Sequence, residues 1–409
     1  MSQQSTEAKI PFRLSETQRA DHRRRLLELT SLPTAAGREG RVERYVEAWA
    51  AQLSGLELSR DSSGNIHIKA AGDTSAVPLV IEAHLDHPAF VVERVLGPAT
   101  LQVAFRGGVM DDYFDDAAVE FYEKSDERGE RPIPGRIISK IEGEDKIAKR
   151  YEVELTEETE ALAAGDIGRW CFDPPEIDSD GVIWTHACDN LASVAGAMSA
   201  MEALLDQNAS SGVRLLFTRA EEIGFIGAIG ACREGSLPNE SRVIVLETSR
   251  SFADSPIGGG PILRVGDRIS VFSPGLTAAV GERAKALAGK PAEPLSTQKR
   301  DDSGWRWQRK LMAGGACEAS VFTGFGYEAT CVCLPLGNYH NMADLDAVQA
   351  GTNTDRPRVG REHVSVADSE GMVELLVACG LDLDGSAGFR SKIDELYAER
   401  SFVLVERDA

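Results

Sequence analysis

Two adjacent glutamates, Glu221 and Glu222, are the residues whose types and spacing point most directly to chemistry. They follow the apolar run 213–218, which predicts a buried strand, and they precede a glycine-rich segment that predicts a helix start. Open α/β sheets build their sites at the carboxyl ends of strands. One carboxylate can therefore hold a metal ion while its neighbour acts as a general base. An isolated glutamate pair also occurs on solvated helix faces, so a catalytic role needs support from other residues of the chain.

Four further apolar runs lead into residues that can bind metal ions. Run 78–83 leads into His84 and Asp86, run 182–188 into Asp189, run 243–246 into Glu247, and run 329–335 is followed by His340. This set supplies nitrogen and oxygen ligands only, which fits zinc, cobalt or manganese and argues against a thiolate cluster.

The elements that position these residues change in pattern along the chain. Residues 15–53 predict helices, the first of them opened by the capping box Ser15–Gln18. A core sheet is predicted to start near residue 64, and short alternating strands over 92–179 predict an inserted β domain. From 182 to 380 strands and helices alternate, which predicts an α/β sheet with helices on both faces, and 391–400 predicts a terminal helix.

Taken together, these features resemble metallopeptidase family 42, the glutamyl and tetrahedral aminopeptidases, within the clan of two-zinc exopeptidases. The match spans nearly the whole chain and includes the segments 32–39, 258–264 and 314–319. The resemblance implies an α/β fold with a mixed central sheet flanked by helices and an inserted small β-barrel. The expected domains are 1–91 and 181–409, which form the two parts of the catalytic α/β domain, and 92–180, the barrel. It also implies a homo-oligomer.

The resemblance also implies a role for each candidate. His84, Asp189 and Glu247 would bind one metal ion, and Asp189, Glu222 and His340 the other, with Asp189 bridging and a cis peptide bond between Asp189 and Asn190. Glu221 would be the general base, and Asp86 would orient His84. The implied cofactors are two divalent ions, Zn²⁺ first, with Co²⁺ or Mn²⁺ as alternatives.

Four features depart from the family pattern, and one of them is the sequence around His340, which reads Asn338-Tyr339-His340-Asn341. His87 begins a His-Pro-Ala segment where the family usually has an acidic residue, an aliphatic residue and glycine. Glu247 and Glu318 stand where family members mostly carry aspartate. Either glutamate is a candidate to offset the charge of a substrate ammonium group.

The predicted function is therefore a metal-dependent aminopeptidase that removes residues from peptide N-termini. One alternative is an amidohydrolase of the same clan, a deacylase or carboxypeptidase. Such enzymes usually carry an α/β lid after the glutamate pair, whereas the insertion here precedes Asp189 and is all-β. A second alternative is a non-catalytic binding relative, and the retention of Glu221 together with every ligand argues against it.

Composition agrees with an enzyme of this kind. The chain has 409 residues, of which 42% are hydrophobic, enough for a sizeable core. Its formal net charge of −21 argues against nucleic acid as a partner. No membrane segment is visible, the first residues lack the apolar core of a signal peptide, and the seven cysteines show no paired spacing. A cytoplasmic location is expected, with a peptide as the substrate.

Other histidines and cysteines are expected to have structural roles. His186 lies close to Asp189 in sequence and is interpreted mainly as a packing residue. Cys331 and Cys333 lie on one face of a strand and are predicted to be buried free thiols. Three more histidines are predicted at the surface or in loops: His22, His67 and His363.

Overall fold

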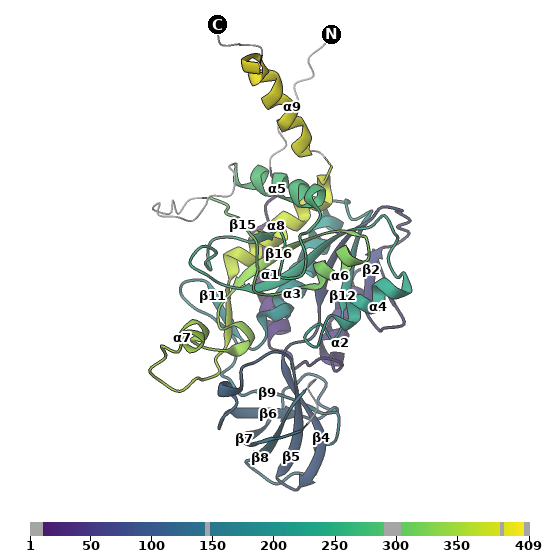
Figure 1. Cartoon of the computed structure of the whole chain (residues 1–409). Helices are drawn as coiled ribbons and strands as arrows, with labels where there is room; N and C mark the ends of the chain where they lie inside the picture. The colour runs from purple at the N-terminus through teal and green to yellow at the C-terminus, as the bar shows by residue number, and fades with distance from the viewer. Residues whose placement is uncertain (1–10, 144–147, 290–303, 385–387, 405–409) are drawn as a thin grey trace.

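The computed structural model describes residues 11–143, 148–289, 304–384 and 388–404. A large mixed sheet carries helices on both faces, and a closed β-barrel lies below it in the view of Figure 1. The predicted fold class, α/β with a mixed sheet and a small barrel, is thereby confirmed. Within the described ranges, no helix is both long enough and apolar enough to span a membrane.

The large sheet has eight strands in the order β1-β2-β12-β3-β13-β16-β14-β15. Their bounds are β1 Leu56–Arg60, β2 Ile66–Ala70, β3 Leu79–His84, β12 Val213–Thr218, β13 Arg242–Arg250, β14 Ile262–Arg264, β15 Gln308–Lys310 and β16 Glu328–Leu336. Strands β12, β3, β13 and β16 are parallel neighbours, so their carboxyl ends meet at one edge of the sheet. The sheet starts earlier than predicted, because β1 is a mostly exposed edge strand without an apolar pattern.

Side chains of the central strands alternate between two cores. Ile81 and Ala83 of β3 face a core shared with one set of helices, whereas Val80 faces a second core on the opposite side. The first set is α1 Glu16–Thr30, α2 Gly40–Gln52, α3 Cys188–Asp206, α5 Pro274–Ala288 and α8 Val366–Asp382. The second set is α4 Ile226–Glu234 and α6 Glu318–Gly324. The apolar runs of the central strands are continuous because both faces are covered.

The barrel closes in the order β4-β5-β8-β7-β6-β9. Its strands are β4 Ala89–Gly97, β5 Thr100–Arg106, β6 Ala118–Tyr122, β7 Ile133–Ile141, β8 Lys149–Leu155 and β9 Ile167–Trp170. Aromatic rings fill its interior: Phe90 lies 4.8 Å from Trp170 and Phe105 lies 4.8 Å from Phe114, measured between ring centroids and packed edge to face. Closure leaves no free strand edge in this part of the molecule.

Smaller elements complete the chain. They are a three-stranded sheet of β10 Glu176–Ile177, β11 Val182–Thr185 and β17 Glu362–Ser365, helices α7 Leu345–Ala350 and α9 Gly388–Arg400, and the 3₁₀ turns η1 Asp111–Tyr113, η2 Tyr339–Asn341 and η3 Ser401–Leu404. The capping box predicted at Ser15 is present at the start of α1. The terminal helix predicted at 391–400 is also present, within α9.

The surface prediction for His22 is wrong. Its side chain is fully buried in α1, where the two ring nitrogens lie 2.9 Å from the Ser199 hydroxyl and 2.8 Å from the Ser369 hydroxyl. Burial lowers the pKa of His22 to about 3, so the neutral ring is the buried form. Two hydroxyls from helices far apart in sequence satisfy this ring, which no local pattern could indicate. His67 and His363 are half-buried and lie in strands β2 and β17.

Candidate functional site

The edge where the parallel strands end gathers the predicted site residues. His84 ends β3, Asp86 follows it, Glu221 and Glu222 follow β12, Glu247 lies in β13, Asp189 lies in the first turn of α3, and His340 lies in η2 after β16. Glu222 is half-buried and the others are buried. The peptide bond between Asp189 and Asn190 is cis, as predicted.

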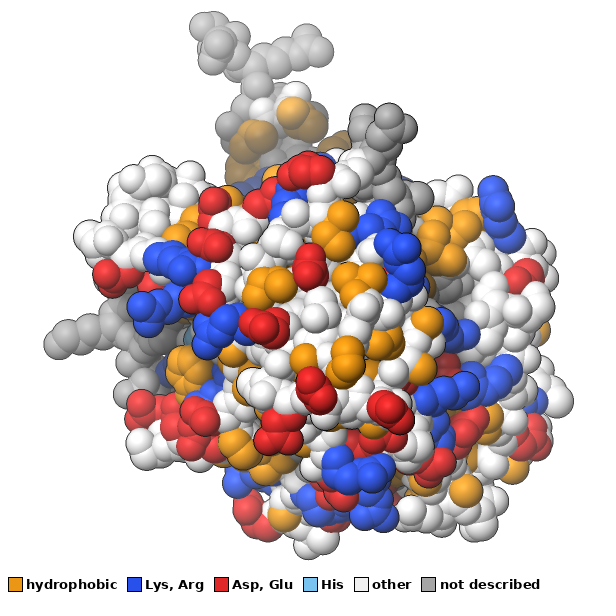
Figure 2. All heavy atoms as spheres, turned by 90° about the horizontal axis from the view of Figure 1, so that it is seen from below, with side chains coloured by type: hydrophobic (Ala, Val, Ile, Leu, Met, Phe, Trp, Pro, Cys, Tyr) orange, Lys and Arg blue, Asp and Glu red, His pale blue; other side chains and the backbone are white. Residues whose placement is uncertain are grey.

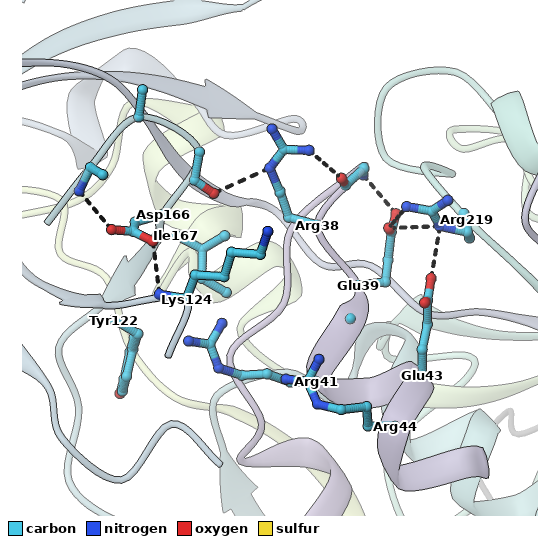
Figure 3. Close-up of a pocket in the computed structure, with 15 residues that line it drawn as sticks. Arg38, Glu39, Arg41, Glu43, Arg44, Tyr122, Lys124, Asp166, Ile167 and Arg219 are labelled. Carbon is cyan, nitrogen blue, oxygen red and sulfur yellow. Dashed lines mark hydrogen bonds and ion pairs between the residues drawn. The ribbon is translucent and has the colours of Figure 1, made fainter. Parts of the chain in front are cut away.

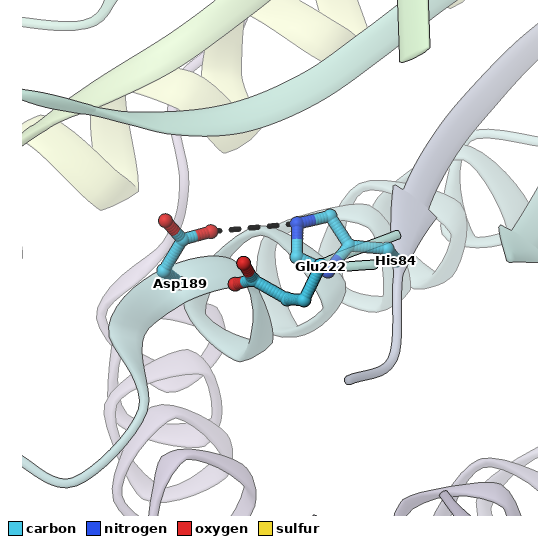
Figure 4. A group of neighbouring side chains, drawn as sticks. All are labelled: His84, Asp189 and Glu222. Atoms are coloured by element: carbon cyan, nitrogen blue, oxygen red, sulfur yellow. Dashed lines mark ion pairs between the residues drawn. The ribbon is translucent and has the colours of Figure 1, made fainter. Parts of the chain in front are cut away.

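Asp189 lies between the two histidines. Its Oδ1 is 3.4 Å from Nε2 of His84, and its Oδ2 is 3.5 Å from Nε2 of His340 (Figure 4 shows the His84 side). Glu222 Oε2 lies 3.5 Å from the same nitrogen of His340. Glu247 Oε2 lies 3.9 Å from Nε2 of His84. The two oxygens of one carboxylate thus face two separate groups of nitrogen and oxygen atoms.

The donor atoms of this site fit divalent metal ions. Ligand atoms about 2.0–2.2 Å from a tetrahedral zinc lie roughly 3.4 Å from each other, close to the separations found here. Asp189 Oδ1 and Glu222 Oε1 are buried and have no hydrogen-bond partner among the described residues. His84 belongs to two groups whose potential ligand atoms all lie within 4.8 Å of one another, one with Asp189 and Glu222 and the other with Glu221 and Glu247. Glu221, which belongs to the second group, thus lies at a distance from Nε2 of His84 that falls between those of the predicted ligands Asp189 and Glu247.

The charges of the site also favour a cation. Burial raises the pKa of both Glu222 and Glu247 well above its usual range, and neighbouring carboxylates add to the effect. Burial opposes a charged His84, yet the carboxylates of Glu221 and Asp189 raise its pKa well above the usual value. Carboxylates held this close repel one another unless positive charge lies between them.

Glu221 has the environment of a buried general base. Its Oε2 lies 3.8 Å from Nε2 of His84. Burial raises the pKa of Glu221 to about 8; the charge of His84 acts in the opposite direction, and nearby carboxylates such as Glu318 raise it further. A pKa near neutrality lets a carboxylate both take and return a proton.

Asp86 has a second contact that its sequence position does not indicate. It lies near His84 as predicted, with 3.5 Å between its Oδ1 and the ring Nδ1, and its backbone carbonyl oxygen lies 3.2 Å from the same nitrogen. The same carboxylate accepts hydrogen bonds from the backbone amides of Glu221, at 2.9 Å, and Glu222, at 3.1 Å. Asp86 therefore ties the end of β3 to the loop that carries the glutamate pair.

Glu362 is a positioning residue that the sequence analysis missed. This buried side chain of β17 accepts hydrogen bonds from the backbone amides of Asp189 and His340, each at 2.9 Å. The barrel also contributes, because the carbonyl of Gly108, after β5, accepts a hydrogen bond from Nδ1 of His340 at 2.7 Å. Neither contact has a sequence signal, since both depend on segments that meet only in the folded chain.

His87 lies behind Asp189 rather than among the candidate ligand atoms. Its Nδ1 contacts the carbonyl oxygen of Asp189, and its Nε2 lies 2.9 Å from Oδ1 of Asn341. Burial lowers the pKa of His87 to about 4. His87 therefore holds the backbone of Asp189 against the segment that carries His340. His186 is buried near it, packed against Phe172 with 5.6 Å between ring centroids.

A pair of carboxyl groups lies next to the site, inside the core. The hydroxyl of Thr218 is 2.8 Å from Glu82 Oε1 and 2.8 Å from Glu318 Oε2, and both glutamates are fully buried. Burial raises the pKa of Glu82 to about 7 and that of Glu318 well above its usual range. A hydroxyl has one proton, so the second contact needs a protonated carboxyl as its donor. Glu318 thus directs one oxygen to Thr218 and is not exposed to solvent.

Replacing Thr218 by Val is expected to lower the free energy of unfolding by about 1–3 kcal/mol, because both buried carboxyls lose a partner. Urea denaturation of metal-free protein measures the change. Thr156→Val is the matched control, since the exposed Thr156 hydroxyl makes only a 3.3 Å contact to a carbonyl and its loss should cost less than about 0.5 kcal/mol. Equal costs for the two variants would contradict the role assigned to Thr218.

Comparison with known proteins places the chain in a family. The model of the M42 glutamyl aminopeptidases matches residues 64–288, more than half of the 409-residue chain. The chain therefore belongs to the M42 glutamyl aminopeptidase family, and it is a peptide-bond hydrolase. This family is metal-dependent, in agreement with the candidate metal-binding groups of the site. A search of curated proteins found no match.

Solved structures share the fold at low sequence identity. An aminopeptidase from the archaeon Desulfurococcus kamchatkensis has a TM-score of 0.67 and 17% identity, covering 90% of this chain and 96% of that one. The TET1 peptidase of Pyrococcus horikoshii has a TM-score of 0.67 and 16% identity, covering 88% and 99%. The TET aminopeptidase of a marine-sediment Thaumarchaeota archaeon has a TM-score of 0.66 and 18% identity, covering 90% and 98%.

Proposed function

We propose that this chain is an aminopeptidase that uses two divalent metal ions to release residues from peptide N-termini. The observation that carries the proposal is the position of Asp189, whose two oxygens lie 3.4 Å from His84 and 3.5 Å from His340. A carboxylate that faces two nitrogen donors in this way suits a bridge between two ions. Zinc is the first candidate, with cobalt or manganese as alternatives.

Each residue then has a distinct task. His84, Asp189 and Glu247 would hold one ion, and Asp189, Glu222 and His340 the other. When bound, the ions would polarise the scissile carbonyl and lower the pKa of a water molecule. Glu221 would take the proton of the attacking water and pass it to the leaving amine, which its raised pKa supports. Asp86 would hold His84 and the glutamate loop in place, as its contacts with both indicate.

The barrel is the feature that supports an aminopeptidase over a deacylase. It is all-β and lies in the chain before Asp189. We propose the division into a catalytic domain of residues 1–91 and 181–409 and a barrel domain of residues 92–180. We also propose a homo-oligomer in the cytoplasm. The TET1 peptidase of Pyrococcus horikoshii assembles into a tetrahedron or a large octahedral shell, which supports an oligomer for a chain of the same fold.

A blocked substrate tests the proposed reaction. One peptide is compared in its free and N-acetylated forms, at equal concentration, with zinc, cobalt or manganese supplied in turn. Only the free form should be cleaved, because an aminopeptidase must accept the terminal ammonium group close to the buried carboxylates. Acetylation removes that charge and adds bulk. Equal cleavage of both forms, or release of acetate from the blocked form alone, would support the deacylase.

A further inference from the structure

A cavity of about 450 Å³ lies between the start of α2 and the barrel. Five basic side chains line it: Arg38, Arg41, Arg44, Lys124 and Arg219 (Figure 3). The chain as a whole has a net charge of −21, yet basic side chains still form clusters on the face seen from the barrel end (Figure 2). A concentration of positive charge in a hollow of an acidic protein suggests an anionic ligand.

Four of these five cations have no carboxylate partner among the described residues. Arg38, Arg41 and Arg44 donate hydrogen bonds to backbone carbonyls of the facing barrel segments. The shortest of these bonds are 3.2, 2.8 and 3.4 Å, respectively. Lys124 is exposed and forms no ion pair in the described ranges. None of the four therefore forms an ion pair with a carboxylate in the described part of the chain.

The acidic side chains that line the cavity already have hydrogen-bond or ion-pair partners. Glu39 lies 2.7 Å from Arg219, and Glu43 lies 3.0 Å from the same guanidinium (Figure 3). Asp166 accepts hydrogen bonds from two backbone amides, at 2.7 and 2.8 Å. The fifth cation is thus paired, whereas Asp166 bonds to backbone amides and acts on Arg41 only through space.

The start of α2 borders the same cavity. Glu39 occupies the N-cap position but makes no capping hydrogen bond. Its carboxylate instead accepts from the amides of Gly37, at 2.6 Å, and Ala220, at 3.0 Å. Gly40, the first residue of the helix, lines the cavity. The amino end of α2, where the helix dipole favours negative charge, therefore forms part of the cavity wall.

Arg41 is the side chain that most needs such a ligand. It is only 8% exposed; its guanidinium donates hydrogen bonds to the carbonyls of Asp126 and Glu123 and lies over the ring of Tyr122, 5.7 Å from the centroid. Burial lowers the pKa of Arg41, the carboxylate of Asp126 acts in the opposite direction, and the charge of Arg44 adds to the lowering. A buried guanidinium that forms no direct ion pair is costly, and a bound anion would offset part of that cost.

We propose that this cavity binds a small phosphate-bearing anion. Guanidinium groups present donors in a fork that matches phosphate oxygens, and helix N-termini bind phosphate by the same combination of amides and dipole. The volume is that of a site for a small organic ligand rather than for a bare ion. The proposal is independent of the metal site. The two are neighbours, because the Glu39 carboxylate also bonds to Ala220, which precedes Glu221.

Calorimetric titration tests the proposal with three probes: inorganic phosphate, pyrophosphate and adenosine monophosphate. The double variant Arg44→Gln/Lys124→Gln should bind at least the tightest probe roughly 10–100-fold more weakly than the parent protein, since charge-assisted hydrogen bonds are lost. Arg128→Gln is the matched control, because Arg128 is exposed and does not line the cavity. Both altered side chains of the double variant are exposed, and an unchanged unfolding midpoint shows that it folds.

Phosphate can also bind to metal ions, so the titrations are repeated with Asp189→Ala protein after treatment with a chelator. Binding that survives there and falls in the double variant supports the cavity. The comparison of probes identifies the source: preference for adenosine monophosphate indicates a phosphorylated metabolite, and equal binding of phosphate indicates the free ion. No saturable binding by any probe, or the same affinity in parent and double variant, overturns the proposal.

Discussion

Replacing Glu221 by Gln is expected to lower kcat by roughly 10²–10⁴-fold, the range that a positioned general acid–base group contributes. Glutamine keeps the size of the side chain but cannot accept and return a proton. Glu221 lies 3.8 Å from His84, and its backbone amide is held by Asp86 through a 2.9 Å hydrogen bond. That backbone contact is unaffected by the substitution, so the loop should keep its position.

The measurement pairs kcat for a free-amino-terminal peptide with metal analysis of the same preparation. Metal content should stay at the parent value, because the proposed ligand set does not include Glu221. Glu234→Gln serves as the control: Glu234 contacts Ser62 and Ser63 at the surface, and its loss should leave turnover unchanged. Near-normal turnover of Glu221→Gln would exclude the base, and loss of a metal ion would make Glu221 a ligand instead.

The sequence predicted the central strands and the residues that follow them, for a physical reason. Parallel strands buried on both faces need continuous apolar runs, and polar residues can begin only where the strand leaves the core. His84, the glutamate pair and His340 each lie at such a point. Their convergence follows from the parallel pairing of β12, β3, β13 and β16, which brings the carboxyl ends to one edge.

The partners of these residues could not be predicted in the same way. Glu362 bonds to the backbone of Asp189 across 173 positions of sequence, and the carbonyl of Gly108 comes from the barrel. Such contacts depend on backbone amides and carbonyls, which every residue carries, so residue type gives no signal. The edge strand β1 was missed for the opposite reason, because exposed strands do not require an apolar pattern.

The barrel contacts a residue of the candidate site directly. Gly108 of the barrel segment accepts a hydrogen bond from His340, 2.7 Å long, so one candidate ligand is oriented by the inserted domain. A metal-bound imidazole is held in its tautomer by the acceptor on its other nitrogen. For His84, the group next to Nδ1 is Asp86, which follows the same strand two residues later, and not a residue of the barrel. The two halves of the site thus depend on different parts of the molecule.

Asp189→Ala is expected to remove both metal ions at once, because Asp189 faces His84 with one oxygen and His340 with the other. Loss of an outer partner of a ligand alone costs 10–100-fold in metal affinity, so loss of the shared ligand should cost roughly 100-fold or more at each position. Peptide hydrolysis should fall with metal content, by about 10³-fold or more, because the reaction loses its polarised carbonyl and activated water.

Glu222→Ala is the matched comparison for that variant. Glu222 lies 3.5 Å from His340 and takes part in only one half of the proposed site, so this variant should lose one ion and keep the other. Metal analysis after dialysis against a zinc-buffered solution distinguishes the two cases. Two ions in the parent protein, one in Glu222→Ala and none in Asp189→Ala would support a bridging carboxylate. Full occupancy in Asp189→Ala would reject it, because two cations facing each other across the site would then need no shared anion from this residue.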